Sequence, residues 1–175
     1  GLAATTTSFS GGMTTGVGSS SFGVRLESCS GAPTWIGANS FGRFPGSTAG
    51  STRTAFTTTG AVCAPEIDGG SHIGCEVGVN CYGIDCDGSS QCVVRNGATV
   101  RATGGPADVA VAMRCRNGAC ASISGSTLVA GPLTRGGPTG IGLEIDGASP
   151  LINDNSITGP NGGAIAVAAS RWHGV

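Results

Sequence analysis

A six-residue pattern of apolar and polar positions recurs along the chain and predicts a series of short β-strands. In most copies the third and fifth residues are apolar, whereas the fourth and sixth are charged or small, which is the alternation of a half-buried strand. One copy departs from this pattern, because Thr57 and Thr59 occupy its inward positions, and we expect a poorly fitted or differently registered strand there. The copies occupy residues 22–27, 55–60, 82–87, 111–116, 141–146 and 165–170.

Two further short apolar elements follow most copies of this strand. Ile67 and Ile123 belong to the first of these elements, and Val100 and Leu128 belong to the second. Three short strands per repeat, with turn residues between them, predict a parallel β-helix whose turns stack about 4.8 Å apart. The inward positions of the six-residue strand are then predicted to form the core: Val24, Ile84, Met113, Leu143, Leu26, Cys86, Cys115 and Ile145.

The clearest copy of the whole repeat lies at residues 141–159 and reads Ile-Gly-Leu-Glu-Ile-Asp-Gly-Ala-Ser-Pro-Leu-Ile-Asn-Asp-Asn-Ser-Ile-Thr-Gly. It resembles the repeat of the right-handed parallel β-helix proteins, the secreted bacterial, pectate-lyase-like solenoid superfamily, and residues 82–105 resemble it more loosely. The resemblance covers residues 22–170 and implies an all-β fold, a right-handed parallel β-helix with three short strands in each of about six rungs. Because the superfamily includes polysaccharide-degrading enzymes, adhesins, ice-binding proteins and structural spacers, the resemblance implies no single function.

The length of 175 residues suits a single domain spanning 1–175. Within this domain we expect an incomplete N-terminal rung and loop at 1–20, repeated rungs at 21–164 and an incomplete C-terminal rung at 165–175. The 33 glycines suit the turns of such a fold, because glycine adopts positive φ without steric cost. The absence of Lys and the scarcity of Leu and Glu argue against a helical bundle.

The charge and hydropathy of the chain exclude two classes of partner. Charged residues make up 11% of the chain and its net charge is -1, which provides no basic surface for nucleic acid. No run of 18 apolar residues occurs, so no segment is predicted to span a membrane.

The charged residues of the repeated strand are predicted to stack in two columns on the outer face. Asp85, Arg114 and Glu144 form one predicted acid-base-acid column. Asp87, Arg116 and Asp146 form the other. Opposite charges on neighbouring strands stabilise a sheet by about 0.2–1 kcal/mol per pair. We therefore expect these columns to specify strand register, and a cation or sugar site is the alternative that the interleaved arginines disfavour.

The eight cysteines are even in number and include no Cys-x-x-Cys motif, which favours disulfides over a zinc ribbon or an iron–sulfur site. Disulfides imply an oxidising compartment, and we expect a secreted or cell-surface protein. Free buried thiols and a metal site remain as alternatives. The expected pairing is Cys86–Cys115 and Cys92–Cys120 between stacked rungs, with Cys75–Cys81 and Cys29–Cys63 as the other two bonds.

No catalytic motif is evident, and we expect no enzyme activity, no metal and no cofactor. An alternative is a carbohydrate-binding or polysaccharide-degrading β-helix that uses Asp85, Asp87, Asp146 and Arg95. A second alternative is ice binding, which needs threonines aligned from rung to rung. The threonine runs at 5–7 and 57–59 follow the chain and are not expected to align in this way.

The two ends of the repeat are expected to be incomplete turns. Residues 4–12, which include Thr7 and Phe9, are predicted to form a third strand whose rung lacks the other two. Residues 165–170, which include Val167, are predicted to form the first strand of an unfinished rung, with Trp172 nearby. Such ends predict a bacterial structural protein that associates with itself head to tail into a filament, or a piece of a longer surface solenoid.

Overall fold

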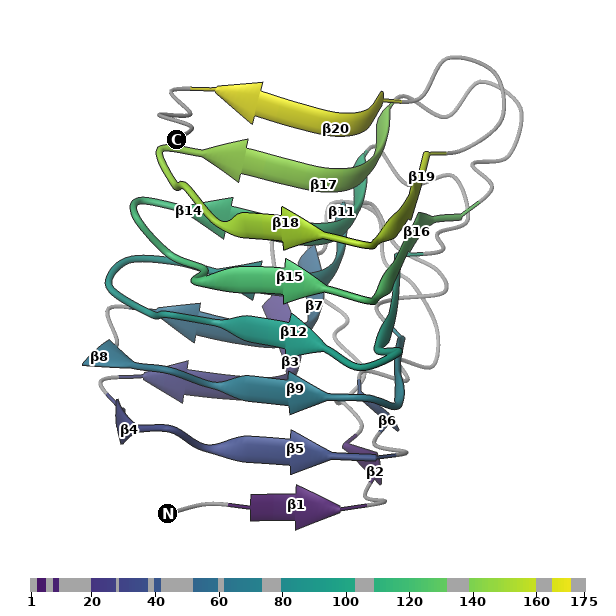
Figure 1. Ribbon diagram of the computed structural model, residues 1–175. Coiled ribbons are helices and arrows are strands. Elements are labelled where there is room, and N and C mark those ends of the chain that lie inside the picture. Colours follow the sequence, from purple (N-terminus) through teal and green to yellow (C-terminus); the bar gives the residue numbers. More distant parts are fainter. Residues whose placement is uncertain are drawn as a thin grey trace.

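The structure is a computed structural model that describes residues 3–5, 8–9, 20–27, 29–37, 40–41, 52–59, 62–73, 80–102, 109–131, 139–159 and 165–170. These residues form strands and turns, and no helix occurs among them. All strand pairs are parallel, and the chain winds into a solenoid in which successive turns stack on one another (Figure 1). The predicted all-β parallel solenoid is therefore confirmed. No described helix is long and apolar enough to cross a membrane.

Three sheets run along the solenoid, and in the middle turns the chain passes through the first, the second and the third in order. The first sheet contains β3 (Ser20–Glu27), β7 (Thr52–Thr59), β11 (Asn80–Cys86), β14 (Val109–Arg116), β17 (Thr139–Asp146) and β20 (Ile165–Ser170). The second contains β1 (Ala3–Thr5), β5 (Thr34–Ile36), β9 (Glu66–Asp68), β12 (Val93–Arg95), β15 (Ser122–Ser124) and β18 (Leu151–Asn153). The third contains β10 (Ser71–Ile73), β13 (Thr99–Ala102), β16 (Thr127–Ala130) and β19 (Ser156–Thr158). Two short pairs complete the set, β2 (Ser8–Phe9) with β6 (Ser40–Phe41) and β4 (Ser30–Gly31) with β8 (Val62–Cys63).

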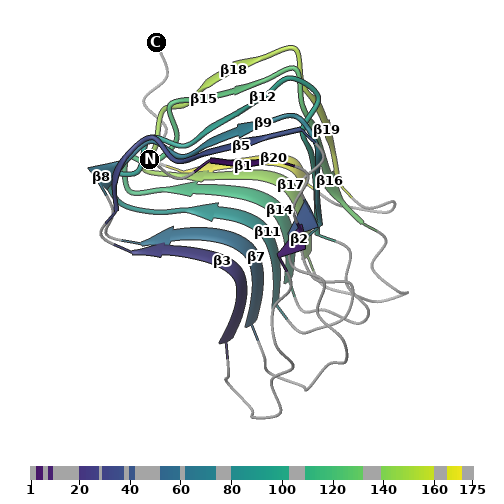
Figure 2. The same cartoon turned by 90° about the horizontal axis from the view of Figure 1, so that it is seen from below.

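The core lies inside the solenoid, between the first and second sheets, which face each other when the solenoid is seen along its axis (Figure 2), and Val100 and Leu128 of the third sheet belong to it as well. Ile84, Met113 and Leu143 are partners in adjacent strands, and all three are fully buried. Trp35 of the second sheet meets Phe56 of the first edge-to-face, with ring centroids 5.0 Å apart. The predicted inward positions are buried, apart from Val24 and Leu26, which are partly buried and pack against the core.

The strand predicted at 55–60 is displaced by one residue from its predicted register. Thr54 pairs with both Phe22 and Tyr82, so the repeated pattern begins at residue 54. A one-residue slip exchanges the two faces of a strand, and this register places the large Phe56 in the core. Thr58 is buried as well, and its hydroxyl oxygen accepts a hydrogen bond from the Asp87 backbone N–H at 3.1 Å.

The ends of the described solenoid differ in part from the prediction. Residues 4–12 do not hold a third strand alone, because β1 pairs with β5 in the second sheet and β2 pairs separately with β6. Phe9 is the register partner of Phe41. At the other end β20 pairs with β17 in the first sheet as predicted, and Val167 is the partner of Leu143. Thr7 and Trp172 lie outside the described residues.

Candidate functional site

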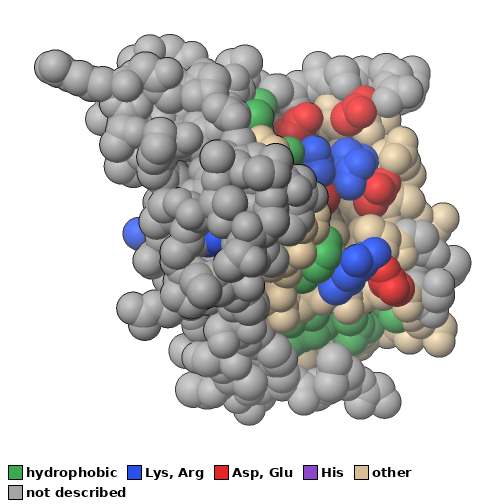
Figure 3. Space-filling view, turned by 180° about the vertical axis from the view of Figure 1, so that it is seen from behind, with side chains coloured by type: hydrophobic (Ala, Val, Ile, Leu, Met, Phe, Trp, Pro, Cys, Tyr) green, Lys and Arg blue, Asp and Glu red, His purple; other side chains and the backbone are tan. Residues whose placement is uncertain are grey.

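A cluster of charged side chains covers part of the outer face of the first sheet, and we name it the charged cluster. Figure 3 shows acidic and basic groups side by side on this face. Strand pairing places Asp85, Arg114 and Glu144 in one column, and it places Arg116 beside Asp146. Asp87, which contacts Arg116, completes the cluster. Its members are Asp85, Asp87, Arg114, Arg116, Glu144 and Asp146.

Asp85 is the centre of the charged cluster. Its carboxylate accepts hydrogen bonds from Arg114, with Nε at 3.0 Å and Nη2 at 2.7 Å. It also accepts from Arg116, with Nε at 3.2 Å and Nη2 at 3.0 Å. Only 6% of Asp85 is exposed, so one largely desolvated carboxylate is held by two guanidinium groups. Bidentate bonds of this kind fix orientation as well as supplying energy.

Arg116 also contacts Asp87, the acid of its own predicted column. Its Nη2 lies 3.1 Å from Asp87 Oδ2, and Asp87 Oδ1 accepts a hydrogen bond from Asn117 Nδ2 at 2.7 Å. The diagonal bond from Arg116 to Asp85 was not predicted, because the prediction paired charged residues only within each column. Arg116 lies two residues after Arg114 and therefore on the same face of the sheet. A long side chain at this position can reach the diagonal neighbour Asp85, and this spacing was the sequence signal for the bond.

The charged cluster changes the proton affinity of two of its members. Burial of Arg114 acts to lower its pKa, but the hydrogen bond and charge of Asp85 outweigh burial, and the pKa is raised. The guanidinium carbon of Arg114 also lies 4.1 Å from the centre of the Tyr82 ring. Burial raises the pKa of Glu144, and the positive charge of Arg114 opposes this shift without cancelling it.

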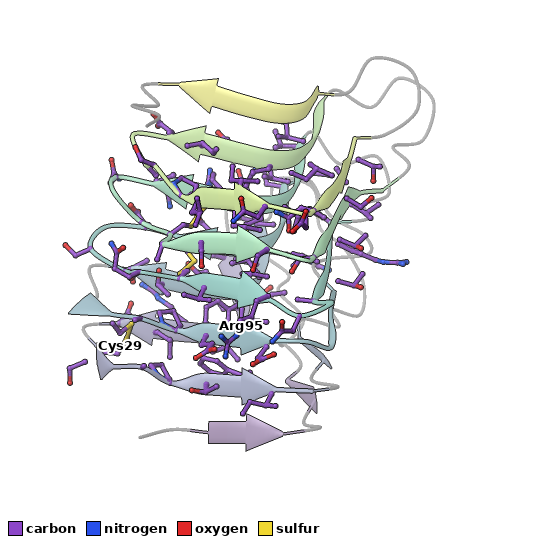
Figure 4. The ribbon with its side chains drawn as sticks, viewed as in Figure 1. Cys29 and Arg95 are labelled. Atoms are coloured by element: carbon purple, nitrogen blue, oxygen red, sulfur yellow. A yellow bond between two sulfur atoms is a disulfide. The ribbon has the colours of Figure 1, made fainter. Side chains whose placement is uncertain are left out.

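Arg95 belongs to a different surface from the acids with which the polysaccharide alternative grouped it. It lies on β12 of the second sheet, where Figure 4 labels it. Its guanidinium pairs with Glu66 and lies 3.0 Å from Asp68, which also accepts a hydrogen bond from Asn96 Nδ2 at 2.7 Å. The predicted grouping is therefore wrong, because β11 and β12 are consecutive strands of two different sheets.

The disulfides agree with the prediction in one bond and contradict it in two. Cys29 pairs with Cys63, with Cα atoms 5.4 Å apart, and Figure 4 labels Cys29 at this bond. Cys81 is also disulfide-bonded, whereas its predicted partner Cys75 lies outside the described residues. The predicted Cys86–Cys115 and Cys92–Cys120 bonds are wrong, because the bonds are Cys86–Cys92 and Cys115–Cys120.

The turn geometry explains the two corrected disulfides. Cys86 and Cys115 are register partners, so their side chains enter the core side by side from adjacent parallel strands. After Cys86 the chain turns at Gly88, whose φ is 71°, and Cys92 then faces Cys86 within the same rung. The Cα atoms are 6.6 Å apart in this bond and 5.8 Å apart in Cys115–Cys120, both within the range of disulfides.

A column of hydroxyl residues, which the sequence analysis missed, runs along the third sheet. Strand register aligns Ser71 with Thr99, Thr99 with Thr127, and Thr127 with Ser156. The neighbouring column is mixed, because Arg101 and Val129 are partners there. The threonines of this column lie 28 residues apart in the sequence, so alignment of the third strands was the signal that could have revealed them.

Among the described side chains, three sulfur atoms that are held in disulfides lie close together. The Sγ atoms of Cys86, Cys92 and Cys120 all lie within 4.8 Å of one another in the buried core.

No protein-family model, curated protein or solved structure matches the chain. The relationship to a pectate-lyase-like superfamily and the bacterial source therefore stay predictions from the repeat.

Proposed function

We propose that the chain is a non-catalytic structural module of a secreted or cell-surface bacterial protein. In this proposal it forms a right-handed parallel β-helix of about six rungs and is related to the pectate-lyase-like solenoids. It associates head to tail with a second copy, or it continues a longer solenoid of the same kind.

The observation that carries this proposal is that Asp85, Arg114 and Arg116 of the first sheet form ion pairs between neighbouring rungs. Both oxygens of Asp85 accept hydrogen bonds from two arginines, and Arg116 also contacts Asp87. A calcium ion needs several carboxylate or carbonyl oxygens, and it would have to displace both guanidinium groups to reach Asp85. The charged cluster is therefore better suited to fixing the register of β11 against β14 than to binding a substrate.

The outermost strands of the sheets support end-to-end association. β3 and β20 are the outermost strands of the first sheet, and β1 and β18 are those of the second. Because every pair is parallel, a strand added at either edge keeps the direction of the sheet. Edge strands carry N–H and C=O groups that another chain can pair with, whether that chain is a second copy or a further rung.

The disulfides support an extracellular location. Three bonds are defined, Cys81 is bonded as well, and none of the cysteines that the structure describes is free. Disulfides of this number persist in oxidising compartments and are rare in the cytosol of most organisms. Two of them also close the turns after β11 and β14.

The assembly is tested by sedimentation and negative-stain imaging of the non-reduced chain. Ala169 is the register partner of the core residue Ile145, so Ala169→Lys places a charge where the next rung must close. Ala168 is the partner of Glu144 on the outer face, so Ala168→Lys is the matched control. We expect filaments from the original chain and the control, but not from Ala169→Lys. If all three proteins form only discrete particles at every concentration examined, the proposal is contradicted.

Ice binding is a second candidate, favoured by the hydroxyl column of the third sheet. The column places one Ser or Thr on each of four stacked strands, about 4.8 Å apart along the axis. The test is thermal hysteresis of the intact chain against Thr127→Lys, with Ser124→Lys on the second sheet as the control. Loss of hysteresis only in Thr127→Lys would support this candidate, and an original chain without hysteresis would exclude it.

A further inference from the structure

Two disulfides on neighbouring rungs bring four sulfur atoms together in the core. Cys86–Cys92 closes the turn after β11, and Cys115–Cys120 closes the equivalent turn after β14. The register pairs Cys86 directly with Cys115. All four cysteines are at most 3% exposed, so the sulfurs form one enclosed group between two rungs.

The spacing of three of these sulfurs is close to that of a tetrahedral metal site. The Sγ atoms of Cys86, Cys92 and Cys120 all lie within 4.8 Å of one another. A zinc ion with four Zn–S bonds of about 2.3 Å separates neighbouring sulfurs by about 3.8 Å. Breaking the two S–S bonds lets each bonded pair separate to that distance, and Cys120 Sγ then needs to approach those of Cys86 and Cys92 by about 1 Å at most. Cys115 Sγ lies outside this group of three but is bonded to Cys120 Sγ at 2.10 Å, so it has to turn toward the other sulfurs once that bond is broken. β11 and β14 hold Cys86 and Cys115 as register partners, and Cys92 and Cys120 lie in the turns that follow these strands.

We propose that the reduced chain binds one Zn²⁺ ion through the thiolates of Cys86, Cys92, Cys115 and Cys120. The two stacked disulfides and the zinc site are then alternative states of the same four sulfurs. Thiolate ligands select a borderline-soft cation such as Zn²⁺ over Ca²⁺ or Mg²⁺. The four cysteines belong to a cluster of buried core residues that also contains Ala98, Ala119 and Met113. This inference concerns the reduced chain and is independent of the proposed structural role.

The conversion is balanced with a phosphine as the reductant. Each phosphine takes the oxygen atom of one water molecule and gives two electrons to one S–S bond, and the two protons of that water appear on the two thiols. Two phosphines therefore yield four thiols and two phosphine oxides. Zn²⁺ then replaces the four thiol protons, which are released to the buffer.

The zinc state has a structural consequence for a chain that has not yet been oxidised. Reduction removes the covalent links that close the turns after β11 and β14. A metal bound to all four sulfurs would close both turns and join the two rungs, and its binding free energy would add to the stability of the fold. Zinc is therefore expected to raise the melting temperature of the reduced chain and to leave that of the oxidised chain unchanged.

The experiment measures zinc retained by the full chain after anaerobic reduction with a phosphine, addition of zinc chloride and desalting. We expect about one zinc per reduced chain, and none on the oxidised chain. The test variant is Cys86→Ser with Cys115→Ser, which removes one ligand from each rung. The matched control is Cys29→Ser with Cys63→Ser, which removes a disulfide outside the sulfur group and should retain the zinc.

Cobalt provides a readout that does not depend on the folding of a variant. Co²⁺ bound to the reduced original chain should show the intense visible absorption of a tetrahedral tetrathiolate site, and one equivalent of Zn²⁺ should remove it. The proposal is overturned if the reduced chain retains no metal, or if cobalt is bound without this absorption. Equal zinc retention by the two double variants would also overturn it.

Discussion

Replacement of Asp85 by Asn tests whether the charged cluster holds the rungs in register. The substitution preserves the shape of the side chain but removes the charge that pairs with Arg114 and Arg116. The side chains of these arginines are only 18% and 28% exposed, so water replaces little of the lost interaction. The new amide also directs N–H donors toward two cationic donors, which breaks part of the hydrogen-bonding arrangement.

The expected loss in the free energy of unfolding follows from these contacts. Removing one partner of a buried ion pair costs about 3–5 kcal/mol. The arginines are partly exposed and Asn keeps one acceptor oxygen, so we expect about 2–3 kcal/mol, which corresponds to a fall in Tm of about 4–12 °C for a domain of this size. Urea unfolding of the non-reduced chain, followed by far-UV circular dichroism, measures the difference.

An exposed ion pair on the same sheet provides the control. Arg25 pairs with Glu27, and their side chains are 45% and 56% exposed. Exposed pairs of this kind contribute about 0–1 kcal/mol, so Glu27→Gln should have little effect. The reasoning is refuted if Asp85→Asn lowers the free energy of unfolding by no more than Glu27→Gln does.

Three further predictions concern single features of the fold. Burial raises the pKa of Glu144, so the stability that its neutral form gives is present at low pH and is lost as the pH rises through the folded-state pKa. Glu144→Gln should therefore be more stable to urea than the original chain at pH 7, and this difference should vanish below about pH 4. Gly83→Ala should lower the free energy of unfolding by about 1–3 kcal/mol or more, since a Cβ there would lie 2.4 Å from the Ala112 carbonyl oxygen, and an unchanged value in the same assay would contradict this close approach. Non-reducing peptide mapping should recover Cys86 linked to Cys92 and Cys115 linked to Cys120, and recovery of Cys86 linked to Cys115 would contradict the structure.

The repeat predicted the fold because its inward positions are strongly apolar. Ile84, Met113 and Leu143 align on spacing alone, and their strands pair in that register. The strand around Phe56 was misplaced by one residue because threonines lie on both of its faces. The alternation of apolar and polar residues therefore does not distinguish the two registers. The burial of Phe56 against Trp35 decides between them, and this contact joins two sheets that the local pattern does not relate.

The contacts within the candidate site were harder to predict than its members. Strand register was enough to place Asp85 beside Arg114, but the bond from Arg116 to Asp85 depends on how far a long side chain reaches across the sheet. The disulfides depend on turn geometry in the same way. Cys86 has a register partner, Cys115, on the next rung and a second cysteine, Cys92, after its own turn, and the bond forms with Cys92 once the chain has turned at Gly88.

Electron cryo-microscopy of the non-reduced chain tests the central claim, that this solenoid is a structural module that continues end to end. The account predicts filaments whose rungs repeat every 4.8 Å or so along the axis, with an axial rise per subunit of about 29 Å for about six rungs. Discrete particles of a single chain at every concentration examined would contradict it.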